Sequence, residues 1–137
     1  MGASALGALL FDDWETPRTI RTVTALFALG GAVSFPLGLV LARFLAFRRH
    51  CEVAFAAAFL SFASVTACVT AGFFALQYRE YYAEWHGDAF TRIWFLQFIH
   101  TIAAALYQFA VLGLRLFFPI GFVALLLASF WFARHPR

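Results

Sequence analysis

Lysine and asparagine are absent from this chain of 137 residues, and only 12% of its residues are charged. A soluble domain usually has about a quarter of its residues charged and about half apolar. Here 64% are hydrophobic, and phenylalanine alone occurs 19 times. This composition predicts that lipid, rather than water, surrounds most of the chain.

The basic residues are all arginines, and they are few and dispersed, with a net charge of +3. Proteins that bind nucleic acids carry a clustered basic patch or stripe that follows the phosphate backbone. The sequence has no such cluster, so we expect no nucleic-acid partner.

Cysteine is scarce, with Cys51 and Cys68 the only two in the sequence. Helical spacing places them too far apart for a disulfide, which needs Cα atoms within about 7 Å. There is no CxxC motif, so zinc binding and thioredoxin-like redox chemistry have no support. We expect two free cysteines that act as small packing residues.

The first 16 residues lack the basic segment of a cleaved signal peptide, because no basic residue precedes Arg18. The apolar stretch MGASALGALLF is followed at once by DDWE. We therefore expect residues 1–16 to form a retained N-terminal arm at the membrane interface.

Four apolar segments are candidates for membrane spans, which require about 20 residues to cross a bilayer, and the last of the four is short. We predict an all-α integral membrane bundle of four transmembrane helices, a single domain over residues 1–137 with both termini on one side. One bent helix over 89–133 is the alternative for the last two segments. The predicted helices cover about 17–47, 53–86, 89–112 and 119–133.

The first of these helices has a clear start signal. Thr16 is a suitable N-cap residue, and Pro17 suits the first helical position. Pro36 lies within the helix and predicts a kink, because proline removes one backbone hydrogen bond.

The second helix has no signal that would stop it at the membrane surface. The stretch QYREYYAEWH contains neither Gly nor Pro, so we expect the helix to extend beyond the membrane to His86. Gly87 is predicted as its left-handed terminal residue, and Asp88 as the N-cap of the third helix. Gly113 is predicted to end that third helix.

Small residues recur along the first two helices and predict close helix packing, which in lipid depends on such residues. The alternative is a pore lined by them. The predicted packing residues are Gly30, Ser34, Gly38 and Ala42 on the first helix, and Ser61, Ser64, Cys68 and Gly72 on the second.

Polar residues follow one face of the third helix, and polar groups at membrane depth face protein or a cavity. We expect this face to contact the bundle or a partner subunit. His100 is either a helix–helix hydrogen-bonding residue or a site for haem, quinone or proton transfer. The residues of this face are Gln97, His100, Thr101, Tyr107, Gln108 and Arg115.

The helical extension carries aromatic residues that are typical of the membrane interface. The predicted interfacial rim consists of Tyr78, Arg79, Tyr81, Tyr82 and Trp85. Glu80, Glu84 and Asp88 are spaced four residues apart, and paired carboxylates can bind a cation or relay protons. The Glu-x-x-His spacing of diiron bundles is absent, so we expect a solvated rim with Arg79 serving Glu80 or a lipid phosphate, and no metal site.

The sequence contains no complete set of catalytic residues, and we expect no enzyme. Our first hypothesis is a non-catalytic accessory subunit of an energy-converting membrane complex of the respiratory-chain, ATP synthase or photosynthetic type. Its partners would be other membrane subunits and phospholipids, in a mitochondrial inner or bacterial cytoplasmic membrane. The alternatives are a quinone- or haem-binding or proton-relay protein that uses His100, and a small transporter.

Overall fold

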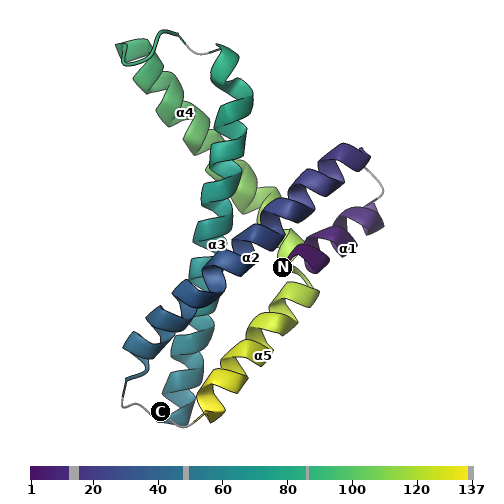
Figure 1. The fold of residues 1–137 in the computed structure, drawn as a ribbon, viewed down its shortest axis with the longest axis vertical. Helices are drawn as coiled ribbons and strands as arrows, with labels where there is room; N and C mark the ends of the chain where they lie inside the picture. The colour runs from purple at the N-terminus through teal and green to yellow at the C-terminus, as the bar shows by residue number, and fades with distance from the viewer. Residues whose placement is uncertain (13–15, 48–49, 86, 136–137) are drawn as a thin grey trace.

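The computed structural model describes residues 1–12, 16–47, 50–85 and 87–135, and within these ranges every regular element is helical (Figure 1). The prediction of an all-α protein is confirmed. Three helical stretches are long and apolar enough to cross a membrane, namely Pro17–Leu45, Cys51–Trp85 and Arg92–Phe117. The five α-helices are α1 (Gly2–Asp12), α2 (Pro17–Leu45), α3 (Cys51–Tyr82), α4 (Arg92–Gln108) and α5 (Ile120–Arg134).

Helix α2 begins where its sequence signals predict. The Thr16 side chain accepts a hydrogen bond from the Thr19 backbone N–H at 3.4 Å, and Pro17 occupies the first turn. The helix then continues through Pro36 to Leu45.

Helix α3 extends as expected, and a single 3₁₀ turn over Ala83–Trp85 follows it. The predicted end at His86 lies outside the described residues. The turn into α4 differs from the prediction: Gly87 does not have a positive φ, whereas Phe90 does, at 67°. Asp88 is not the N-cap. Thr91 caps α4 instead, and its hydroxyl accepts from the Trp94 N–H at 3.1 Å.

Helix α4 does not end at Gly113 as predicted. A π-helical turn over Phe109–Gly113 and a 3₁₀ turn over Leu114–Phe117 carry it on, and Gly113 keeps a right-handed helical conformation. The break comes at Phe118, whose backbone is extended (φ −92°, ψ 145°). Pro119 follows and has no N–H to continue the helix. The last two segments are therefore separate helices rather than one bent helix.

A contact between the start of α3 and the end of α5 shows where the last helix finishes. The Cys51 thiol, at the start of α3, donates to the Ala133 carbonyl near the end of α5 at 3.5 Å. The end of α5 thus lies beside the start of α3, far from the start of α2 and from the outer end of the α3–α4 hairpin (Figure 1). The N-terminus lies near the middle of the molecule (Figure 1), so the two termini do not meet at one end, and the prediction that they share one side of a membrane stays a prediction.

Residues 2–12 form helix α1, which packs against the other helices. Ala5 and Leu9 are buried in a core cluster with Phe27 of α2 and Phe109. Helices α1 and α5 both begin near the middle of the molecule and run toward opposite ends (Figure 1). The side chain of Met1 fills the space at this point, between two glycines: an added Cβ would lie 2.9 Å from Met1 Cγ at Gly31 and 3.0 Å from Met1 Sδ at Gly121.

The predicted small residues of α2 all lie against α3. Gly30, Ser34, Gly38 and Ala42 are buried. A Cβ on Gly38 would lie 2.7 Å from the Phe62 ring, so the backbone of α2 approaches the side chains of α3 directly. The hydroxyls of Ser34 and Thr66 are 3.1 Å apart and form a buried hydrogen bond between the two helices.

The face of α3 that packs is not the predicted one. Ser61 is buried as expected, but Ser64, Cys68 and Gly72 are exposed. An added Cβ on Gly72 would meet nothing within 4 Å. Small residues occur on several sides of α3, and the interface uses a line that includes larger ones. The buried residues of α3 are Ala54, Ala58, Ser61, Phe62, Thr66, Thr70 and Ala75.

Both cysteines are free, as predicted. They are exposed rather than buried, so the expectation that they act as small packing residues is wrong.

Candidate functional site

Helix α4 is the least covered of the three long apolar helices. In the most apolar window of its stretch, 11% of the residues are buried, against 33% for both α2 and α3. Its packing partner is the C-terminal half of α3, with which it forms a hairpin that projects away from the other helices (Figure 1). The outer surface of α4 is thus available to lipid or to another protein.

A groove between this hairpin's two helices contains His100. It has a volume of about 510 Å³, and its described lining residues are Tyr82, Trp85, Leu96, Gln97, His100 and Thr101. The Gln97 Oε1 atom accepts from the Gly87 N–H at 3.0 Å, and the Thr101 hydroxyl donates to the Gln97 carbonyl at 2.7 Å. His100 is exposed and forms no hydrogen bond with any residue that the structure describes.

The other residues of the predicted polar face do not join this groove. Tyr107 is 71% exposed. Gln108 Nε2 donates to the Tyr78 hydroxyl at 3.4 Å and so links α4 to α3. Arg115 lines a different hollow, beside Ser4 of α1. The face that helical spacing predicted as one surface is therefore divided among three environments.

The predicted rim is an aromatic surface on the outer part of α3. The ring centroids of Tyr78 and Tyr82 are 4.8 Å apart, and those of Tyr81 and Tyr82 are 5.1 Å apart. Trp85 is 78% exposed. These rings suit a membrane–water interface, where amphipathic aromatic side chains gather.

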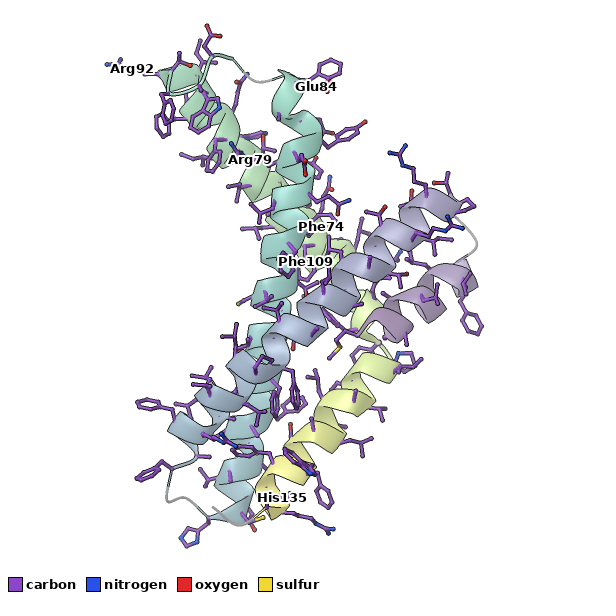
Figure 2. All side chains as sticks on the ribbon, viewed as in Figure 1. Phe74, Arg79, Glu84, Arg92, Phe109 and His135 are labelled. Atoms are coloured by element: carbon purple, nitrogen blue, oxygen red, sulfur yellow. The ribbon has the colours of Figure 1, made fainter. Side chains whose placement is uncertain are left out.

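Arg79 is placed differently from the expectation that it serves Glu80 or a lipid phosphate. Its guanidinium lies over the rings of α4, 4.8 Å from the centroid of Phe98 and 5.8 Å from that of Trp94 (Figure 2). Such cation–π contacts stabilise by about 0.5–1 kcal/mol at exposed sites. Arg79 therefore stabilises the packing of α3 against α4.

A second groove, which sequence analysis missed, separates the N-terminal half of α2 from the C-terminal half of α3. Its volume is about 620 Å³. Patterns within one helix cannot reveal it, because its walls come from helices that approach each other only in the fold. Its described lining residues are Arg18, Thr19, Thr22, Val23, Phe74, Gln77, Tyr78 and Tyr81.

The carboxylates of the hairpin do not form a metal centre in the described part of the chain. No group of three or more His, Cys, Asp or Glu side chains comes together there. Glu84 lies at the outer end of the hairpin, and Asp88 belongs to the turn into α4 (Figure 2).

Comparison with protein-family models, with curated proteins and with solved structures finds no match to this chain.

Proposed function

We propose that this chain is an integral membrane protein that crosses the bilayer three times. Helices α2 and α3 form two crossings, and α4 with α5 forms a third that is broken at Pro119. Helix α5 has 15 residues, which gives a length of about 22 Å against a hydrocarbon core of about 30 Å. It is therefore too short to serve as the fourth span that the sequence suggested.

This arrangement supports an orientation. The sequence at the end of α2 and in the α2–α3 connection carries three arginines within residues 43–49. Because arginines gather on the cytoplasmic side, we place the α2–α3 connection in the cytoplasm or the mitochondrial matrix, in a bacterial cytoplasmic or mitochondrial inner membrane.

The length of α3 indicates which of its residues lie inside the hydrocarbon layer and which lie outside it. The stretch Cys51–Trp85 has 35 residues, which corresponds to about 50 Å, well beyond the hydrocarbon thickness of about 30 Å. We place its polar outer part, from Gln77 onward, among the headgroups and in water. His100 shares a groove with Tyr82 and so lies near headgroup level, where an unpartnered imidazole costs little.

Within the membrane, we propose that the protein is a non-catalytic accessory subunit that docks to a larger complex through α4. The energy-converting complexes expected from the sequence are the first candidates. The observation that carries this proposal is the low burial of α4. Two small residues one heptad apart lie exposed on either side of Tyr107, namely Ala103 of α4 and Ala110 of the π-helical turn that continues it. Small residues allow another helix to approach closely.

A bulky substitution on this face tests the docking. We expect the double variant Ala103→Trp with Ala110→Trp to reduce recovery of co-purifying membrane proteins at least about tenfold, a loss of about 1.4 kcal/mol of binding free energy. The measurement is affinity purification in a mild detergent, followed by native gel analysis and mass spectrometry. Val40→Trp is the matched control, because Val40 is 67% exposed on α2.

Equal recovery of the same large assembly from the wild type and from the double variant would remove α4 as the docking helix. A wild-type protein that migrates as a free monomer would overturn the subunit proposal altogether.

The groove at His100 favours one alternative, a bound quinone or haem. Its described lining offers an imidazole, a phenol and an indole beside apolar surface. For an accessory subunit, we expect His100→Ala to leave the amount and activity of the assembled complex within about twofold of wild type, a change below 0.5 kcal/mol. Absorption spectra and quinone extraction of both purified proteins check this. A stoichiometric chromophore or quinone that His100→Ala removes would favour the cofactor function instead.

A further inference from the structure

The groove between α2 and α3 lies where these helices diverge. They are in tight contact at Gly30, whose Cβ position would lie 3.1 Å from Thr70 Cβ, and they separate toward the α1–α2 and α3–α4 connections (Figure 1). The groove of about 620 Å³ occupies this separation. In a membrane, this groove must be filled by a molecule that can bind its polar side chains and contact its apolar ones.

One wall of the groove carries a positive charge. Arg18 is exposed and forms no ion pair with any residue that the structure describes. The neighbouring hydroxyls are already engaged, because Thr22 donates to the Arg18 carbonyl at 3.0 Å and Thr19 pairs with Thr16 at 2.9 Å. The guanidinium is therefore the strongest hydrogen-bond donor that this wall offers.

The facing wall offers neutral polar groups from α3. Gln77 and Tyr81 line the groove and are exposed, and the bond from Gln108 holds the Tyr78 hydroxyl in place. An amide and a phenol can each donate a hydrogen bond. Among the described lining residues there is no carboxylate, so the walls favour a ligand rich in acceptor oxygens.

The inner part of the groove is apolar. Val23 and Phe74 lie one helical turn or less farther into the bundle than Thr22 and Gln77. The Phe74 ring is held against Phe109, with centroids 6.1 Å apart (Figure 2). From the end of the molecule inward, the groove thus presents a cation, then polar groups, then hydrocarbon.

We propose that this groove binds one phospholipid, whose phosphate lies between Arg18 and the polar groups of Gln77 and Tyr81, and whose acyl chains lie along Val23 and Phe74. Guanidinium binds phosphate oxygens through a planar fork of donors, and the order of polarity along the groove matches that of a lipid. This inference rests on the membrane insertion proposed above, but not on docking through α4.

Thermal unfolding of the purified, delipidated protein in detergent tests the proposal. Palmitoyl-oleoyl phosphatidylglycerol and the corresponding phosphatidylethanolamine should both raise the midpoint of the wild type. Dioleoylglycerol, which lacks phosphate, should not. We expect Arg18→Gln to weaken the apparent phospholipid affinity at least about tenfold, and Arg18→Lys to retain part of it. Arg21→Gln is the matched control, because Arg21 is exposed on the same helix but does not line the groove.

Equal phospholipid stabilisation of Arg18→Gln and wild type would overturn the proposal, as would an equal effect of dioleoylglycerol. A matching shift with inorganic phosphate alone would assign the site to a free anion instead of a lipid. Carbonate extraction of cell membranes tests insertion separately. A protein that stays in the membrane but shows no lipid effect would disprove only the lipid site.

Discussion

Replacement of Phe27 by Ala should lower the free energy of unfolding by about 3 kcal/mol, near the lower end of the range for truncation of a buried Phe. Phe27 is 1% exposed and lies 5.0 Å from the Phe117 ring and 6.2 Å from the Phe109 ring, measured between centroids. This cluster joins α2 to the 3₁₀ and π-helical turns after α4 and to Ala5 of α1. Its loss would loosen three segments at once.

The lower end of the range applies because, in the membrane proposed above, lipid tails are as apolar as the core. The variant loses packing contacts and gains a cavity, but little transfer free energy. Unfolding is measured by far-ultraviolet circular dichroism as the mole fraction of sodium dodecyl sulfate rises in a mild detergent. Phe44→Ala on the same helix is the control, since Phe44 is 79% exposed. Similar midpoints for the two variants would show that the cluster does not hold the fold together.

Substitution of Gly30 by Leu should destabilise the protein by about 2–3 kcal/mol, a typical cost of overpacking a close contact. Even a Cβ at this position would lie 3.1 Å from Thr70 Cβ and 3.3 Å from Thr70 Cα. Rotation of the Thr70 side chain cannot relieve the contact with its backbone. Helices α2 and α3 would have to separate, which would also weaken the buried Ser34–Thr66 hydrogen bond.

The same substitution at Gly72 makes the matched control. Gly72 lies on α3, is exposed and has no neighbour near its Cβ position. Because glycine within a helix costs up to about 1 kcal/mol relative to alanine, Gly72→Leu should be neutral or slightly stabilising. Both variants are measured in the same detergent titration. A loss at Gly72 as large as that at Gly30 would mean that the exposed face of α3 is a packing surface, as the sequence had suggested.

The contrast between these two glycines shows what a sequence pattern can and cannot determine. On α2, small residues four apart form one line from Gly30 to Ala42, and that line lies against α3. On α3, small residues occur on several sides, so their spacing does not select a face. The choice depends on which side chains fill the space beside α2, and Phe62 and Thr70 do so.

Some of the candidate sites could be predicted from sequence patterns, whereas others are formed only by the fold. The sequence identified His100 and the aromatic rim, because each is a local exception within an apolar helix. It did not bring Arg18 together with Gln77, because the two lie on separate helices and only the divergence of α2 and α3 places them on one groove. It also assigned Arg79 to Glu80 or a lipid, whereas the nearby rings of α4 provide its partner.

By itself, the sequence determined the helical class, the presence of helices long and apolar enough to cross a membrane, and the start of α2 at Thr16 and Pro17, since these follow from composition and from contacts within one turn of a helix. The tertiary structure decided the packed face of α3 and the opposite ends at which α2 begins and α5 finishes. These features depend on contacts between residues far apart in the chain, where packing outweighs the local preference of any single residue.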